Sequence, residues 1–180
     1  MDSEICDFLA GDELIEVIPN FTSGSIQLIG GDMGPFEAGL PVEVPLWIGI
    51  NLRKRMKCVL KVPNWLLIDC LKDLITLENE SNSLLQLPSL HFFEIAHIVV
   101  RDFKEDLQDG DQVKTLIQDL WDKREAKIRS STLKFLKQST YKSAQMDNIQ
   151  QIEITQMRGP LIAATRNTER LLQNKHSTQN

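Results

Sequence analysis

Apolar and polar residues follow two different periods along the chain, and the period changes near residue 63. Before this point, short runs alternate apolar with polar side chains, which is typical of half-buried strands. These runs span 14–18, 25–29, 40–44 and 58–62. A short amphipathic helix precedes them, and a second helix, which Pro45 can open, interrupts them. A unit this small has little core of its own, so we expect it to pack on the rest of the chain or on a partner.

From Pro63 onward the apolar residues recur at spacings of three and four, which predicts amphipathic helices. We expect four helices, over about 63–79, 89–104 and 111–137 and from 147 onward. The polar segments 80–86 and 138–145 predict a loop and a linker. Asp111 is expected to cap the third helix, and Asp147 with Gln150 forms a variant of the capping box for the fourth.

The element order predicts an α+β, mainly α fold. We expect a small β-rich domain over 1–62, a helical-bundle domain over 63–175 and a disordered tail over 176–180. Gly159-Pro160 is expected to kink or break the last helix, because proline removes a helical hydrogen bond and clashes with the preceding turn.

Glycines and prolines gather between residues 29 and 65, where they direct the backbone through several turns. The segment 30–34 (GGDMG) lacks the lysine and the spacing of a phosphate-binding loop, so it is interpreted as a turn. We expect Leu46 and Trp47 to be buried, anchoring the β-rich unit to its helix. The positions to which we assign a structural role are Gly30, Gly31, Pro41, Pro45, Leu46, Trp47, Pro63 and Trp65.

The bulk composition excludes several classes of protein. The 180 residues carry 20 basic and 25 acidic side chains, a net charge of −5, which argues against a surface devoted to nucleic acid. With 42% hydrophobic residues the chain is too apolar for disorder. No apolar run approaches the roughly 20 residues of a membrane helix, and the N-terminus lacks the basic region of a signal peptide. We therefore expect a protein of the cytoplasm or nucleus.

The candidate chemistry is sparse. The three cysteines have no C-x-x-C spacing and are interpreted as reduced, buried thiols. None of the three histidines belongs to an H-E-x-x-H motif, and no G-x-S-x-G nucleophile is present. We therefore predict no catalytic residue, no metal site and no cofactor.

Two charged segments are candidate binding surfaces. The basic cluster 53–57 (RKRMK) lies at a helix end and lacks interleaved aromatics, which favours a solvated helix end or a protein contact over DNA. Trp121 stands among charged residues on the longest helix, and tryptophan and arginine often dominate interfaces. Whether Trp121 is core or interface stays open at this point. The candidate interface residues are Trp121, Arg124, Lys127, Arg129, Arg53 and Arg55, with Arg124 and Arg129 expected near the rim of the interface, paired with partner carboxylates.

Several segments resemble one known family. IPNF (18–21), LIGGDMGPFEAGLPVEVPLWIGINL (28–52) and LWDKREAKIR (120–129) are similar to the GINS complex of eukaryotic DNA replication, in its subunit type called partner of Sld five, number two. The pattern also includes Lys57, Cys58, Leu60, Pro63 and Trp65. The resemblance covers most of the chain and fades at both termini. Gly159-Pro160 departs from it, because relatives have a continuous helix there.

The resemblance implies a non-catalytic structural subunit of a heterotetramer in the nucleus. Its implied partners are three other GINS subunits, the MCM hexamer and a RecJ-like cofactor, which together form the replicative helicase. Contact with DNA is expected to be weak or indirect, and none is expected with a membrane. Two alternatives from other classes are a stand-alone nucleic-acid-binding module and a small enzyme that uses the glycine-rich loop.

Overall fold

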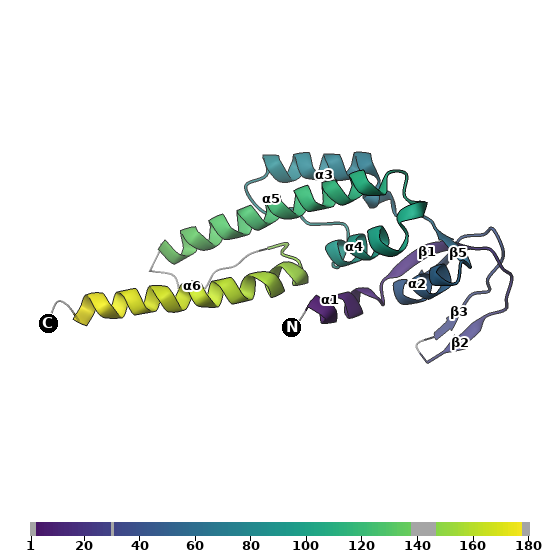
Figure 1. Cartoon of the computed structure of the whole chain (residues 1–180), viewed down its shortest axis with the longest axis horizontal. Helices are drawn as coiled ribbons and strands as arrows, with labels where there is room; N and C mark the ends of the chain where they lie inside the picture. The colour runs from purple at the N-terminus through teal and green to yellow at the C-terminus, as the bar shows by residue number, and fades with distance from the viewer. Residues whose placement is uncertain (1–2, 30, 138–146, 178–180) are drawn as a thin grey trace.

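A computed structural model of the chain describes residues 3–29, 31–137 and 147–177. The molecule is elongated, with the strands at one end and the C-terminal half of the last helix at the other (Figure 1). The helices are α1 (Ser3–Ala10), α2 (Leu46–Lys54), α3 (Ile68–Glu80), α4 (Phe92–Asp102), α5 (Gly110–Lys137) and α6 (Gln151–Ser177), with short 3-10 turns η1 (Asn64–Leu66) and η2 (Lys104–Asp106). The strands are β1 (Leu14–Pro19), β2 (Ile26–Leu28), β3 (Gly31–Met33), β4 (Val42–Pro45) and β5 (Cys58–Leu60). The α+β, mainly α fold is confirmed.

The strands form two separate antiparallel sheets. β1 is the central strand of the order β4-β1-β5, with Val17 opposite both Val42 and Leu60. Alternate residues of β1 are buried, as period-two patterning requires. β2 and β3 form a hairpin in which Leu28 lies opposite Gly31, whose φ of 136° favours glycine. Gly31, which was expected in a turn, is instead the first residue of β3, and Gly30 lies outside the described residues.

One continuous core joins the sheet to the helices. It includes Val17 and Val44 from the sheet, Leu71 from α3 and Phe93 from α4. An aromatic series extends the core, from Trp65 to Phe92 (ring centroids 4.8 Å apart), then Phe93 (5.2 Å) and Trp121 (4.8 Å). The β-rich unit therefore packs on the rest of its own chain, which was one of the two expectations. α1 also lies against α4 and α6. The division into domains at residue 62 stays a prediction.

The expected burial is correct for Leu46 and wrong for Trp47. Leu46 is fully buried, whereas Trp47 is 43% exposed. Leu46 and Gly49 are three residues apart and share the face of α2 that packs on β1, where a Cβ on Gly49 would come within 2.7 Å of Ile15 Cδ1. Trp47 is about 100° further round the helix and so points away from that face.

The N-terminal ends of α5 and α6 differ from those expected. Asp109, rather than Asp111, caps α5, because its Oδ1 accepts a hydrogen bond from the Gln112 N–H (3.1 Å). α6 begins at Gln151, and Glu153 reaches back to accept from the Gln150 N–H (2.8 Å). This hydrogen bond is one of the two that make up a capping box. It joins Gln150 and Glu153, three residues after the predicted pair of Asp147 and Gln150.

The predicted break at Gly159-Pro160 is wrong. α6 runs continuously from Gln151 to Ser177 with Pro160 inside it. Both residues are exposed, so water can solvate the carbonyl that Pro160 leaves without a donor. Gly159 has no Cβ to clash with the proline ring. The helix includes residues 176 and 177 of the expected disordered tail, while 178–180 and the predicted linker 138–145 lie outside the described residues.

Adjacent substitutions in α2 test this packing. Leu46→Ala should lower the free energy of unfolding by about 2–5 kcal/mol, since it removes a fully buried side chain. Trp47→Ala should cost clearly less, although tryptophan is the larger residue. Urea unfolding followed by circular dichroism measures both. Equal losses would contradict the placement of Trp47 at the surface.

Candidate partner interface

Arg124 of α5 is fully buried and uses all of its hydrogen-bond donors inside the chain. Nε and Nη2 donate to the two carboxylate oxygens of Glu153 (2.7 and 3.0 Å), and Nη1 donates to Glu78 Oε2 (3.2 Å). The remaining bonds go to the carbonyls of Leu85 (2.9 Å) and Asn148 (2.8 Å). One guanidinium therefore connects α3, α5, α6 and the loops beside them.

The expectation that Arg124 pairs with partner carboxylates at an interface rim is wrong. The two carboxylates come from this chain, and no part of Arg124 is exposed. Lys127 is also largely engaged, because its Nζ lies 2.6 Å from Glu78 Oε1 and also donates to the Glu78 and Ser83 carbonyls. The buried stripe of α5 shows why: it comprises Val113, Ile117, Leu120, Arg124 and Ile128. Arg124 falls in register with that stripe, and this spacing could have identified it from the sequence.

Trp121 belongs to both the core and the surface. Its ring meets Phe93 edge to face at 4.8 Å, yet the residue is only partly buried. It lines a shallow depression between α5 and α6 together with Ile128, Gln156 and Met157. Arg129 is exposed and pairs with Glu125 one helical turn before it (2.6 Å). The interface role of Trp121 and Arg129 stays a prediction.

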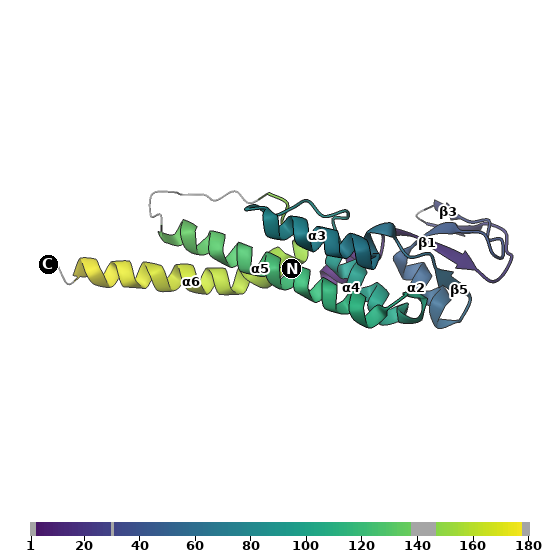
Figure 2. The same ribbon diagram turned by 90° about the horizontal axis from the view of Figure 1, so that it is seen from above.

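Exposed apolar side chains continue along the same pair of helices. Leu133 of α5 and Ile154 and Ile162 of α6 are large, apolar and exposed. α5 and α6 both run toward the end of the molecule that is remote from the sheet, and α6 extends beyond every other labelled element (Figures 1 and 2). A helix pair that projects in this way and carries apolar residues outside the core is typical of an assembly surface.

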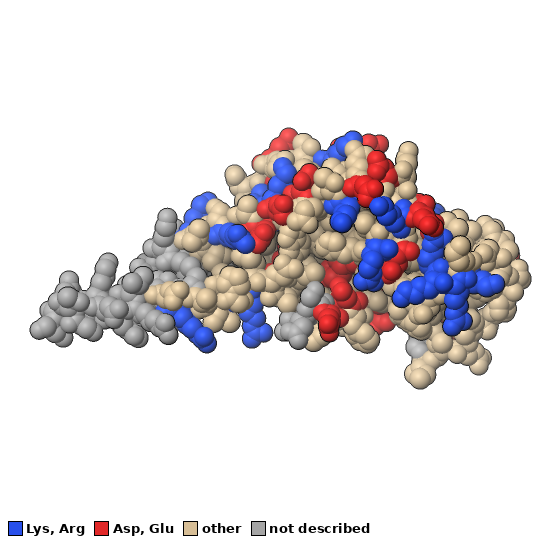
Figure 3. Space-filling view, in the orientation of Figure 1, with Lys and Arg blue, Asp and Glu red and all other residues tan. Residues whose placement is uncertain are grey.

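The basic cluster divides into a bound and a free part. Arg53 Nη2 lies 2.9 Å from Glu105 Oε2 and 3.1 Å from Asp106 Oδ1, which connects α2 to η2. Asp106 also accepts the Leu60 N–H (2.9 Å), which connects η2 to β5. Arg55 is exposed, as are Lys54 and Lys57. Figure 3 shows basic side chains gathered near the β end of the molecule. The expected partner role of Arg53 and Arg55 remains untested.

Neither the cysteines nor the described clusters form a reactive centre. The three cysteines are free, and burial raises the pKa of the Cys58 thiol to about 11, which keeps it protonated. The described residues hold no group of three or more His, Cys, Asp and Glu side chains that could bind a metal ion. Within the same residues, no helix combines the length and apolar character needed to cross a membrane.

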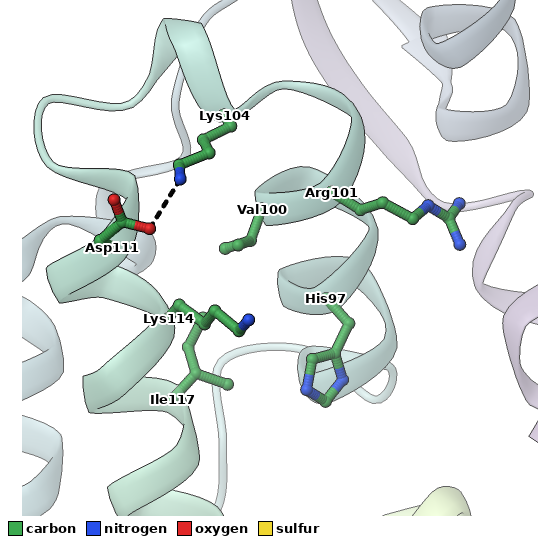
Figure 4. Close-up of a pocket in the computed structure, with 7 residues that line it drawn as sticks. All are labelled: His97, Val100, Arg101, Lys104, Asp111, Lys114 and Ile117. Carbon is green, nitrogen blue, oxygen red and sulfur yellow. Dashed lines mark hydrogen bonds and ion pairs between the residues drawn. The ribbon is translucent and has the colours of Figure 1, made fainter.

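A pocket of about 260 Å³ lies between α4 and α5, and the sequence did not indicate it because its residues come from separate helices (Figure 4). Val100 and Ile117 supply apolar walls, while Lys104 pairs with Asp111 across its edge (2.6 Å). That hydrogen bond lowers the pKa of the Asp111 carboxyl. Burial lowers the pKa of His97, and the positive charge of Lys114 adds to this effect. The pocket can accept a small group but aligns no nucleophile with a base.

Glu94 of α4 is a further buried titratable group that the sequence did not reveal. It is fully buried, and neither carboxylate oxygen has a hydrogen-bond partner in the described structure. Burial raises the pKa of Glu94, and His91, whose Nδ1 is 3.8 Å from Oε1, opposes this only in part. Glu94 therefore contrasts with Glu78 and Glu153, which share the Arg124 guanidinium.

Comparison with known proteins places these features in a family. Residues 2–61 match the PSF2 N-terminal domain, and residues 65–166 match the GINS complex protein helical bundle domain. The chain belongs to the PSF2 family of GINS proteins. It is 45% identical to the probable DNA replication complex GINS protein PSF2 of Caenorhabditis elegans, over 99% of this chain and 98% of that protein. It is 46% identical to the probable PSF2 of Brugia malayi, over 100% of this chain and 95% of that protein. It is 40% identical to human PSF2, over 86% of this chain and 83% of that protein. The family resemblance seen in the sequence is confirmed.

Arg124→Ala should destabilise the chain by about 3–5 kcal/mol, because it leaves Glu78 and Glu153 buried without their partner. Arg129→Ala is the matched control, since it removes an exposed pair worth at most about 0.5 kcal/mol. Urea unfolding measures both variants. Similar small losses would show that the Arg124 network does not hold the helices together.

Glu94 should make stability fall as the pH rises. Its pKa is raised in the folded chain, so above its ordinary value of about 4.5 the unfolded chain ionises first, which lowers the free energy of the unfolded state relative to that of the folded state. The resulting loss of stability continues as the pH rises through the folded pKa. Glu94→Gln should therefore reduce the difference in unfolding free energy between pH 5 and pH 8. Glu125→Gln is the exposed control, and an identical pH profile for Glu94→Gln and the unmodified chain would refute the effect.

Proposed function

We propose that this chain is a non-catalytic structural subunit of the heterotetrameric GINS complex in the nucleus. The observation that carries the proposal is the family match, which covers both the N-terminal and the helical part of the chain. Relatives of nearly equal length are described as DNA replication complex GINS proteins. Its partners are the three other GINS subunits. Through them it joins the MCM hexamer and a RecJ-like cofactor in the replicative helicase, for initiation and fork progression.

The helix pair α5 and α6 is the surface that we assign to the other subunits. Permanent interfaces resemble a domain core cut in half, and the exposed Leu133, Ile154 and Ile162 supply such apolar contacts. Trp121 adds a partly exposed aromatic anchor, and Arg129 a charge at the rim. Arg124 contributes indirectly, because it holds α5 against α3 and the start of α6.

DNA contact has a minor role in this proposal. The net charge is −5, and Arg53 of the basic cluster is neutralised by Glu105 and Asp106. Lys54, Arg55 and Lys57 remain, which supports at most a weak and salt-sensitive contact with a phosphate backbone.

Co-purification tests the assembly surface. The chain carrying Leu133→Asp and Ile154→Asp should lose most of its co-purification with the other GINS subunits when all four are co-expressed, because each change puts a charge into an apolar interface. Leu90→Asp changes a still more exposed leucine in the segment before α4 and should assemble normally. Circular dichroism should show the same helix content in both variants. Normal assembly of the Leu133/Ile154 variant would reject α5 and α6 as the interface, and failure of the unmodified chain to assemble would reject the proposed function.

A further inference from the structure

A large groove lies at the β end of the molecule, away from α5 and α6. It has a volume of about 1200 Å³ and lies between the β2–β3 hairpin and β4. Leu28 and Ile29 line it from the hairpin, Leu14 from β1 and Trp47 from α2, and all four are exposed. Much of the hairpin end of the molecule is without charged side chains in Figure 3. Apolar residues are thus grouped here rather than scattered singly over the surface.

The charges around this groove have one sign. Among the described residues, the charged ones that line it are Asp12, Asp32 and Glu43, and no described lysine, arginine or histidine does so. None of the three acids has an ion pair in the described part of the chain. The basic cluster lies on α2 and just after it, outside this lining set, and its Arg55 lines an adjoining pocket on the other side of Trp47 and Leu28. An occupant with positive charge would be attracted to the groove, and one with negative charge would be repelled.

The groove also presents unpaired strand edges. β4 pairs only with β1, and β3 pairs only with β2, within the described residues. Residues of both strands line the groove, so an extended segment placed there could add to a strand edge. Pro41 and Pro45 border the available part of β4 and restrict such pairing to about three residues, because proline has no N–H to donate. Most of the affinity must therefore come from side chains.

We propose that this groove binds an extended peptide segment of a partner protein in which apolar side chains alternate with lysine or arginine. Alternation places the apolar side chains on one face and the cations on the other. The apolar face would cover Leu28, Ile29 and Trp47, while the cations would reach Asp12, Asp32 or Glu43. Trp47 is the central anchor, which gives a physical reason for leaving a tryptophan exposed on the first turn of α2. This peptide site is additional to the function proposed above. It rests on that function only because the test uses the assembled four-subunit complex.

Fluorescence anisotropy tests the proposal with a labelled peptide that alternates Lys with Val, Leu and Phe, added to the assembled four-subunit complex. A peptide with Glu in place of Lys, and one with Ser in place of the apolar residues, are the ligand controls. We expect the first peptide alone to bind. Trp47→Ala should weaken its binding by about tenfold or more, and Glu43→Lys by at least about threefold. The matched controls Leu90→Ala and Asp73→Lys, which lie outside the groove, should leave binding unchanged.

Three results would overturn the proposal. Equal binding of the Ser peptide, or equal weakening by Asp73→Lys, would show non-specific attraction to an acidic protein. Unchanged binding by the combined Trp47→Ala and Glu43→Lys variant would place the peptide elsewhere. Binding to the chain alone but not to the complex would show that another GINS subunit covers the groove. Each of these leaves co-purification of the four subunits intact, so it separates failure of this proposal from failure of the proposed function.

Discussion

The arrangement of the helices depends on one buried cation. Arg124 brings together Glu78 at the end of α3, Glu153 in the first turn of α6, and the carbonyls of Leu85 and Asn148. A buried guanidinium is tolerated only when its donors are satisfied and its charge is balanced, and both conditions are met here by groups from two distant segments, 78–85 and 148–153. The network therefore ties the position of α6 to that of α3, and both to α5.

This constraint separates the internal charges from those available to partners. Arg124, Lys127 and Arg53 are bound by carboxylates of the same chain, so they shape the molecule from inside. Arg129 and the lysines around Arg55 remain at the surface. The apolar residues divide in the same way: a main core joins the sheet to the helices and a smaller cluster contains Leu84, Ile128 and Met157, while Leu133, Ile154 and Trp47 are exposed. A subunit with a continuous internal core and two separate exposed apolar regions can be folded and still carry surfaces for other proteins.

Local patterning predicted most of the elements and few of the long-range contacts. The long helix α5 was predicted almost to the residue, because its apolar spacing and its flanking turn are local signals. β3 was not predicted, since Gly31-Asp32-Met33 has little strand propensity and owes its conformation to pairing with β2. Trp47 was misplaced because local apolar spacing does not reveal which face of α2 meets β1. Arg124 was assigned to a partner because its carboxylates are 46 and 29 residues away in sequence, although its register with the buried stripe of α5 was visible.

The central claim is that this chain is folded around Arg124 and that, as proposed above, α5 and α6 contact the other GINS subunits. Amide hydrogen exchange, compared between the chain alone and the assembled complex, tests it most directly. The account predicts that amides within 121–133 and 151–162 exchange more slowly in the complex, whereas those of β1 and α4 in the core change little. Unchanged exchange along α5 and α6, with slowing confined to the β2–β3 hairpin, would contradict it.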